Sequence, residues 1–296
     1  SVNALLEMRH PRHVLLKNVD RLLNSPTAQR GRDFAIILSC LARLGYSVEW
    51  RVINAAEYGM PQRRRRVYIY AEYGATEWNP KDRLFHTGIM AEAFPCVPSG
   101  ENIEFEVTVG DDPYETTRRF GKDDKTSVWQ NAGVMQQGHA TTIRTDADYD
   151  GPRTILGDIL TPADQVPDRY WIDDAKLPAW EYLKGAKKER RIAANGFEYT
   201  DSEGPVAFPD PLDRPSRTIL TGEGGAGASR TKHVVLQNGR YRRLMPDELD
   251  QLQMFPKGWT ADGMTDGHRA FCMGNALVTG IPHRIGRVIA SRYGMK

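Results

Sequence analysis

The sequence predicts an α/β domain joined to a smaller, loop-rich and mainly β module. Within the first 70 residues, apolar stretches of strand length alternate with one apolar stretch of helical spacing, which is typical of an α/β domain. From about residue 75 to about residue 210 the pattern changes, because Pro and Gly interrupt short segments, helical periodicity is weak and acidic residues accumulate. This change predicts the second module.

The elements of the first part follow from the spacing of its apolar residues. The opening SVNALLEMR is predicted to be a helix, and His13–Leu16 has the length of a buried strand. Asp33–Leu44 is apolar at helical spacing and stops at a glycine, which commonly ends helices. Strands are expected at Tyr46–Ile53 and Val67–Tyr70. Three strands make an incomplete open sheet, since both faces of such a sheet need cover.

The rest of the chain offers fewer regular signals. Lys184–Arg191 (KGAKKERR) is a basic run that is as typical of a solvated surface as of a phosphate contact. A Gly-rich loop, Thr221–His233, has basic residues at its far end. Helices are expected at about Pro246–Phe255 and about Ile281–Tyr293.

Composition excludes several classes of protein. An apolar content of 40% and a charged content of 26% over 296 residues are those of an ordinary globular chain and not of a disordered one. No apolar run has membrane-spanning length, and the start lacks a secretory pattern, so we expect a cytoplasmic protein without a membrane partner. The three cysteines, Cys40, Cys96 and Cys272, have no metal-binding spacing and cannot form a disulfide framework. No metal site is expected.

The net charge of +2 hides an uneven distribution along the chain. Residues 1–70 hold 12 Lys and Arg against 5 Asp and Glu, and residues 213–296 hold 13 against 7. The charges of the two ends are therefore +7 and +6, and that of the middle is −11. Basic ends around an acidic centre suggest an anionic partner, although solvated charged faces are also common.

The sharpest local signal is four consecutive arginines, Arg63–Arg66, directly before an apolar strand. Because side chains alternate along a strand, Arg64 and Arg66 should face one side, and Arg63 and Arg65 the other. Guanidinium groups seldom enter a core without a partner, so one face should meet carboxylates or phosphates. The alternative is an edge strand with a solvated basic face.

Here the residues resemble a known family, the DNA cytosine-5 methyltransferases. Gly59–Val67 is similar to the eighth conserved motif of that family, whose core is Gln-x-Arg-x-Arg before a strand. Val14–Val19 is similar to the sixth motif, a strand that ends in Glu-Asn-Val. Farther along, segments resemble the ninth motif, the approach to the tenth, and the tenth itself: Arg214–Ile219, Arg243–Pro246 with Leu252–Pro256, and Gly274–Leu277. The order and spacing agree over nearly the whole chain, which indicates the C-terminal half of the family pattern.

The resemblance implies a fold and a reaction. The fold would be a partial Rossmann-like sheet of S-adenosylmethionine-dependent methyltransferases with a target-recognition domain. A cytosine flipped out of double-stranded DNA would enter a protein pocket, a cysteine thiolate would attack C6, and C5 would take a methyl group from S-adenosylmethionine.

The resemblance also assigns roles to residues. Arg66 would contact the base O2 and support the nucleophile, and Arg64 would lie near a phosphate or a pocket carboxylate. Lys17 and Asn18 would occupy the sixth-motif positions, and Asn275 and Ala276 would close over the cofactor. DNA would be bound by residues of the eighth motif, the ninth motif and the Gly-rich loop: Gln62, Arg214, Arg217, Thr218, Thr221, Gly224, Gly225, Arg230 and Lys232. Glycines there would allow close approach to DNA, while Arg230 and Lys232 would neutralise phosphates.

Two departures from the family pattern matter. The sequence has no Phe-x-Gly-x-Gly cofactor loop and no Pro-Cys-Gln nucleophile before the sixth motif. Cys96 follows a proline but lies after the eighth motif, and a small apolar or incidental role fits it better. Cys40 and Cys272 are expected to pack in the core. The sixth-motif Glu position holds Lys17, which cannot accept a hydrogen bond from the cytosine amino group and would oppose protonation at N3.

These departures leave three interpretations open. The chain could be one subunit of a split enzyme whose second chain carries motifs one to five, a catalytically inactive DNA-binding or regulatory fragment, or a truncated enzyme. In each, residues 1–75 would be the C-terminal part of the catalytic domain, 76–240 the target-recognition domain, and 241–296 helices that return to the catalytic domain. The resemblance further suggests a bacterial, nucleoid-associated protein of a restriction-modification system.

Overall fold

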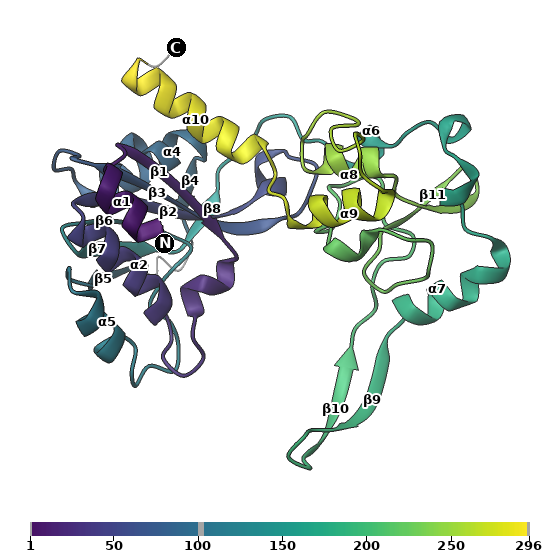
Figure 1. Ribbon diagram of the computed structural model, residues 1–296, viewed down its shortest axis with the longest axis horizontal. Helices are drawn as coiled ribbons and strands as arrows, with labels where there is room; N and C mark the ends of the chain where they lie inside the picture. Colours follow the sequence, from purple (N-terminus) through teal and green to yellow (C-terminus); the bar gives the residue numbers. More distant parts are fainter. Residues whose placement is uncertain (1, 100–103, 295–296) are drawn as a thin grey trace. The chain divides into compact units, whose positions relative to one another are not determined.

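The structure is a computed structural model that describes residues 2–99 and 104–294, and these form two compact units (Figure 1). Unit 1 comprises Ser1–Tyr58, Arg64–Gly151 and Ile281–Lys296. Unit 2 comprises Gly59–Arg63 and Pro152–Gly280. The arginine run is therefore divided, because the chain passes from unit 2 to unit 1 between Arg63 and Arg64.

Unit 1 is built on a six-stranded sheet with the order β1-β3-β2-β6-β7-β5. Every neighbouring pair in this sheet is antiparallel. The six strands are β1 (His13–Asn18), β2 (Tyr46–Asn54), β3 (Arg65–Tyr73), β5 (Glu104–Thr108), β6 (Ala132–Gln136) and β7 (His139–Ile143). Two short strands, β4 (Cys96–Pro98) and β8 (Thr145–Ala147), pair with each other outside this sheet.

Helices cover the sheet of unit 1. The amphipathic α2 (Arg32–Arg43) turns Phe34 and Leu38 into the main core, where the rings of Phe34, Trp50 and Trp129 pack edge to face. Gly133 makes room for Trp50, because a Cβ at this glycine would lie 2.0 Å from the indole ring. The other helices of this unit are α1 (Val2–Arg9), α3 (Pro80–Asp82), α4 (Ile89–Ala93), α5 (Pro113–Arg119) and nearly all of α10 (Gly280–Tyr293).

Unit 2 consists of short elements with long connections. Its helices are α6 (Leu156–Ile159), α7 (Leu177–Lys184), α8 (Pro246–Leu252) and α9 (Asp266–Asn275). Its strands form two antiparallel ribbons, β9 (Lys187–Ile192) with β10 (Glu198–Glu203), and β11 (Val234–Gln237) with β12 (Arg240–Arg243). A core of aliphatic side chains, among them Ile219, Leu249, Leu252 and Met273, joins α8 and α9 to the loops.

The predicted elements of the first 70 residues are confirmed, but the predicted extent of the sheet is wrong. The helices and strands expected there correspond to α1, β1, α2, β2 and β3. However, β5, β6 and β7 come from the segment that was expected to leave the α/β part at residue 75, and they continue its sheet beyond β2. Each of these strands is only five residues long and none alternates between buried and exposed residues, since β6 and β7 are buried along most of their length and β5 is mostly exposed. The sequence therefore gives no clear strand period there.

The compact units also differ from the predicted domain boundaries. Residues 76–151 belong to unit 1, and of the segment 241–296 residues 241–280 belong to unit 2. Only α10 returns to unit 1, where Arg284 donates to the Tyr58 carbonyl oxygen and Arg292 pairs with Glu92. Within residues 2–99 and 104–294, no helix combines the length and the apolar character needed to span a bilayer.

Candidate functional site

The arginine-rich strand β3 lies inside the sheet of unit 1. It pairs with β1 on one side and with β2 on the other, so the alternative of an edge strand is wrong. The predicted alternation of faces holds: Arg64 is buried and Arg66 half-buried, whereas Arg63 and Arg65 are exposed. Arg65 pairs with Asp20 at 3.1 Å on the exposed side.

Lys17, Arg64 and Arg66 form a cluster of three cations in unit 1. Register pairs Lys17 with Tyr68 and Asn18 with Val67, which brings the end of β1 beside the start of β3. Burial first, and then Arg66 and Arg64, lower the pKa of Lys17. Burial first, and then Arg66, lower the pKa of Arg64 to about 10. The three positive charges thus destabilise one another and favour an anion or a strong hydrogen-bond acceptor nearby.

Two neighbours define the surroundings of this cluster. Burial raises the pKa of Tyr68 to about 12 despite the opposing effect of Arg64 and Arg66, so its hydroxyl stays a neutral donor. The Asn18 side-chain oxygen accepts from the Val19 amide at 2.8 Å, which fixes the turn after β1. The sequence prediction that Lys17, Asn18, Arg64 and Arg66 lie together is consistent with these positions.

Gln62, predicted to bind DNA, is fully buried inside unit 2. Its amide nitrogen donates to the Leu252 carbonyl oxygen and its amide oxygen accepts from the Ile219 amide, both at 3.0 Å. The adjacent backbone pairs with Ser216 in a parallel bridge, and the Thr218 hydroxyl donates to the Arg63 carbonyl oxygen. Gln62 therefore fastens the eighth-motif segment to the ninth-motif segment, and its predicted DNA contact is corrected to this structural role.

Arg217 is likewise held within unit 2. Its guanidinium forms two bonds to Asp210, of 2.5 and 3.1 Å. Burial raises the pKa of Asp210, but Arg217 and then His233 lower it more, so the carboxylate stays charged. This geometry favours a structural role for Arg217 over the predicted DNA contact. Arg214 is exposed and, among the residues that the structure describes, forms an ion pair only with its neighbour Asp213, so its side chain is accessible to a partner.

The Gly-rich loop packs on α9. A Cβ at Gly274 would lie 2.3 Å from the Thr221 backbone nitrogen, and a Cβ at Gly224 would lie 2.9 Å from Cα of Gly267. The close approach that was predicted between these glycines and DNA is thus, for Gly224, an approach to a helix. Gly225 has a φ of +82°, and its carbonyl oxygen accepts from Lys232 and Arg243.

Replacing Gly274 by alanine should destabilise unit 2 by about 1–3 kcal/mol, because the methyl group meets backbone that cannot rotate away. Urea denaturation followed by circular dichroism measures the change. Gly227→Ala is the matched control, since a Cβ there meets nothing within 4 Å. Equal stability of the two variants would show that the loop does not pack on α9 in solution.

Arg230 and Lys232, predicted to neutralise phosphates, make contacts within unit 2. Lys232 is 7% exposed, and its ammonium donates to the Gly225 and Gly227 carbonyl oxygens at 3.0 and 2.8 Å. Arg230 donates to the carbonyl oxygens of Leu183, Gly185 and Gly204 and pairs with Glu203. The phosphate role is therefore corrected for Lys232, and Arg230 holds the base of the β9–β10 ribbon.

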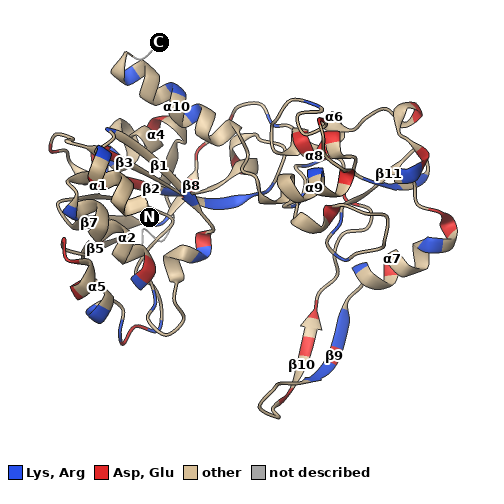
Figure 2. Cartoon of the chain, viewed as in Figure 1, with Lys and Arg blue, Asp and Glu red and all other residues tan. Residues whose placement is uncertain are grey.

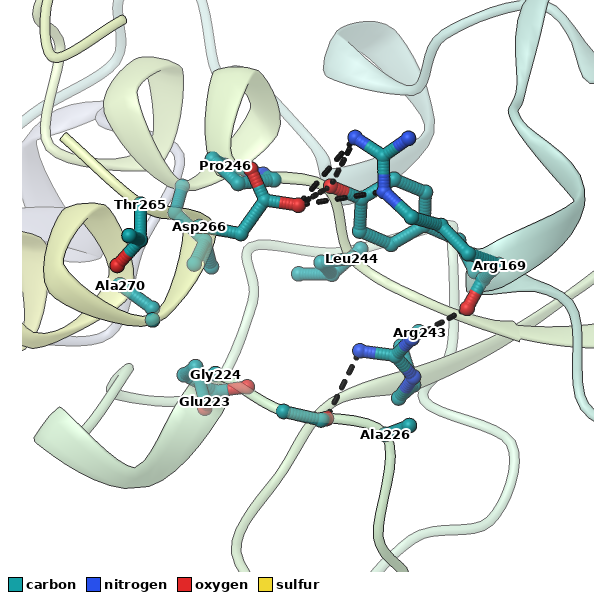
Figure 3. A pocket seen from close by; sticks show the side chains of 14 residues that line it. Arg169, Glu223, Gly224, Ala226, Arg243, Leu244, Pro246, Thr265, Asp266 and Ala270 are labelled. Atoms are coloured by element: carbon teal, nitrogen blue, oxygen red, sulfur yellow. Dashed lines mark hydrogen bonds and ion pairs between the residues drawn. The ribbon is translucent and has the colours of Figure 1, made fainter. Parts of the chain in front are cut away.

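The same loop lines a pocket of about 440 Å³ in unit 2 (Figure 3). Arg243 stands at one side, where it donates to the Gly225 carbonyl oxygen at 2.8 Å and to the Arg169 carbonyl oxygen at 2.5 Å. Asp266 accepts from the Tyr170 hydroxyl and pairs with Arg169 at 3.3 Å. The pocket is apolar toward Leu244, Leu249 and Ala270.

Asn275 and Ala276, predicted to close over a cofactor, lie at the end of α9. The Asn275 side-chain amide donates to the Phe271 carbonyl oxygen of its own helix at 3.3 Å, and Ala276 packs against the core of unit 2. Within residues 2–99 and 104–294, no three His, Cys, Asp or Glu side chains cluster as metal ligands would.

Two buried side-chain pairs in unit 2, Arg242 with Glu248 and Glu223 with His233, were missed in the sequence. Arg242 and Glu248 form two bonds of 2.9 and 2.8 Å, and both side chains are fully buried. Glu223 accepts from the His233 backbone amide and lies 2.8 Å from Nδ1 of its ring. The only sequence signal is the position of Glu248 three residues after Met245, next to a proline, where a capping residue at a helix start is common.

The cysteines differ in their surroundings. Cys96 is buried on β4, and burial is the first cause that raises the pKa of its thiol, which argues against a nucleophilic thiolate. Cys40 is half-buried on α2. Cys272 is exposed on α9, so its predicted core placement is wrong.

Comparison with known proteins places these observations in a family. The family model described as C-5 cytosine-specific DNA methylase matches residues 1–291. The type II methyltransferase M.Sau3AI of Staphylococcus aureus is 42% identical over 287 residues, which are 94% of this chain and 67% of that protein. The type II methyltransferase M.NlaIV of Neisseria lactamica is 39% identical over 108 residues, which are 32% of this chain and 26% of that protein.

Solved structures agree on the fold. The Dnmt2 methyltransferase of Schizosaccharomyces pombe superposes with a TM-score of 0.55 at 11% identity and covers 96% of this chain and 68% of that one. The methyltransferase EhMeth of Entamoeba histolytica gives a TM-score of 0.54 at 12% identity and covers 96% and 63%. The chain thus has an α/β methyltransferase fold and spans about two thirds of the length of these proteins.

Proposed function

The chain belongs to the C-5 cytosine-specific DNA methylase family, and we propose that it forms the base pocket and the DNA-recognition part of a cytosine-5 methyltransferase of a restriction-modification system. In this proposal a cytosine flipped out of double-stranded DNA meets the start of β3, and unit 2 reads the surrounding sequence. The observation that carries the proposal is the cation cluster of Lys17, Arg64 and Arg66.

The cluster fits an everted pyrimidine nucleotide. Arg66, which is half-buried, would donate to the base O2, and the buried Arg64 would hold the flanking phosphate or a pocket carboxylate. Arg66 lies on β3, where it pairs with Ile53 of β2, and Arg64 directly precedes this strand, so both side chains extend from or beside a paired strand, as precise positioning of a substrate requires.

The nucleophile and the main cofactor loop would come from polypeptide outside these 296 residues. Family members use S-adenosylmethionine, but the sequence contains neither Pro-Cys-Gln nor the Phe-x-Gly-x-Gly loop. In this proposal Asn275 and Ala276, at the end of α9, form one wall of the cofactor site.

The sheet of unit 1 offers a place for such polypeptide. Strand β1 pairs with β3 on one side, and no described strand pairs with its other side. Beside this edge lies a mainly apolar cavity of about 350 Å³, lined among others by Leu6, Leu16, Lys17 and Ile37. An unpaired strand edge next to apolar surface favours the addition of another strand. A second chain with motifs one to five would fill this position.

Lys17 bears on activity, because it stands where the family pattern has Glu. Replacing it by glutamate should raise the rate of methyl transfer about 100-fold or more, since a carboxylate accepts from the cytosine amino group and relieves the repulsion with Arg64 and Arg66. The rate is measured as labelled methyl groups transferred from S-adenosylmethionine to duplex DNA. Lys17→Gln is the control that removes the charge without adding a carboxylate.

The test of the whole proposal compares the methyl-transfer activity of three samples. These are the chain alone, a polypeptide from another family member that carries the two missing motifs, Phe-x-Gly-x-Gly and Pro-Cys-Gln, and the mixture of both. Methyl transfer that occurs only in the mixture supports the proposal. Methyl transfer by the chain alone would contradict the proposal that the nucleophile comes from another polypeptide. Activity in the mixture only after Lys17→Glu would mean that the native pocket is degenerate.

A second candidate function is a catalytically inactive DNA-binding or regulatory protein of the same family. Lys17 favours it, because a lysine at this position opposes protonation of cytosine at N3. Duplex binding without methyl transfer, in the mixture of native chains and in the mixture with Lys17→Glu, would support this candidate over the first.

A further inference from the structure

We propose that the β9–β10 ribbon of unit 2 contacts double-stranded DNA with one defined face, the face that carries Lys188 and Arg190. This inference rests on the proposed function, which supplies DNA as the partner. Figure 1 shows the ribbon extending away from the other elements of unit 2, and Figure 2 shows the basic strand β9 beside the more acidic β10. The faces of the ribbon differ in charge.

The register of the two strands sorts their side chains onto the two faces. Directly opposed residues share a face, and residues alternate along each strand. Lys188 lies opposite Ser202 and Arg190 opposite Thr200, with Ile192 and Glu198 completing this face. The other face holds Lys187 opposite Glu203, Glu189 opposite Asp201, and Arg191 opposite Tyr199. The first face therefore carries a net charge of +1 and the second a net charge of −1.

On the second face the cations already have partners. Arg191 pairs with Asp201 at 3.1 Å and with Glu189 at 3.4 Å. The Lys187 ammonium lies 4.4 Å from the centre of the Tyr182 ring. Glu203 on this face pairs with Arg230 at 3.3 Å. These contacts offset the charges of the face within the protein.

On the first face the cations point to solvent. Lys188 and Arg190 are exposed, and neither has an ion pair within the part of the chain that the structure describes. Their opposed neighbours Ser202 and Thr200 carry hydroxyl groups, which hydrogen-bond phosphate oxygens and base edges. Two free cations interleaved with hydroxyls are complementary to a phosphate backbone.

The shape and the support of the ribbon fit this partner. A two-stranded antiparallel ribbon enters the major groove of B-DNA, and six residues of strand reach about 20 Å. A hairpin that packs on nothing is marginally stable, and here its base is held by Arg230, which bonds three carbonyl oxygens of the surrounding backbone. At the tip, Ile192 and Phe197 are 71% and 66% exposed, which suits contact with thymine methyl groups.

The test replaces charges on one face at a time. The double variant Lys188→Gln with Arg190→Gln and the matched control Lys187→Gln with Arg191→Gln remove the same charge from the same strand. Binding of a fluorescent duplex of about 30 base pairs is measured as a function of salt. The first variant should bind about tenfold more weakly or worse at low salt, and its salt slope should fall by about 1.8, which is the loss of two phosphate contacts. The control should change binding about twofold or less.

Three results would overturn the proposal. Equal weakening by both variants would mean that only the general positive field matters, and no change in either would mean that the ribbon lies away from DNA. Absence of duplex binding by the unmodified chain, alone and in the mixture with the two missing motifs, would remove the ribbon proposal together with the proposed function. In the first two results the proposed function stands. Urea midpoints that match the unmodified chain exclude misfolding, because all four side chains lie on the surface of the ribbon.

Discussion

Replacing Arg66 by alanine is expected to lower methyl transfer about 100-fold or more in the mixture with the missing motifs, while the free energy of unfolding stays nearly unchanged. The Arg66 guanidinium is half-buried at the start of β3. Among the described residues, no carboxylate forms an ion pair with it, whereas Arg65 pairs with Asp20. The Arg66 guanidinium donates to the neighbouring Arg65 carbonyl oxygen at 2.7 Å, so its loss removes a donor for the substrate and little native packing. Losing one donor aimed at a reacting group typically costs this much.

Arg65→Ala is the matched control for this prediction, because the same strand carries Arg65 on the opposite, exposed side, where it pairs with Asp20. A salt bridge this exposed contributes little to stability. Initial rates and urea midpoints of both variants are compared. Unchanged turnover in Arg66→Ala, or an equal loss in both variants, would show that the pocket lies elsewhere.

The second large effect concerns stability. Replacing Glu248 by alanine should lower the free energy of unfolding by about 3–5 kcal/mol, because it leaves the Arg242 guanidinium buried without its carboxylate. Glu248 also accepts hydrogen bonds from the Thr161 and Met245 amides, at 2.8 Å each. These contacts join the start of α8 to the loop after α6. Thermal and urea unfolding measure the loss.

Two comparisons test the cause. Glu181→Ala on the exposed side of α7 should change stability by less than about 0.5 kcal/mol, as surface substitutions usually do. The double replacement Arg242→Met with Glu248→Leu should recover most of the loss, because apolar side chains of similar volume often replace a buried ion pair without cost. If the double variant is as unstable as Glu248→Ala, the hydrogen bonds to the two amides matter more than the charge.

Local patterns predicted the first half of the sheet well. The strand and helix stretches up to Tyr70 have clear apolar periods, and each became the expected element. The strands β5, β6 and β7 were not predicted because each is only five residues long and because the pairing that joins them to the first half of the sheet is distant: β6 pairs with β2, more than 75 residues earlier. The pairing of two distant segments cannot be recognised from the hydrophobic periodicity of either segment alone.

For the site residues, too, the sequence predicted some features and not others. The family pattern assigned roles to Lys17, Arg64 and Arg66, and these roles stay predictions, although the three charges lie near one another. It could not show that Gln62 and Lys232 are turned inward, because a polar side chain in a motif looks the same whether it bonds a base or a backbone carbonyl group. The two faces of the β9–β10 ribbon could not be predicted either, because the strand register that assigns each basic residue to a face is known only from the structure.

The sequence by itself determined the family, the α/β class of unit 1 and the positions of the cations along the chain, because these depend on residue types and on their local order. The tertiary structure alone decided which cations have partners: Arg217 and Arg242 are neutralised inside unit 2, while Lys188 and Arg190 face solvent. The physical reason is that burial and ion pairing depend on segments brought together by folding, and a charge acts on a partner only where the protein has not already offset it.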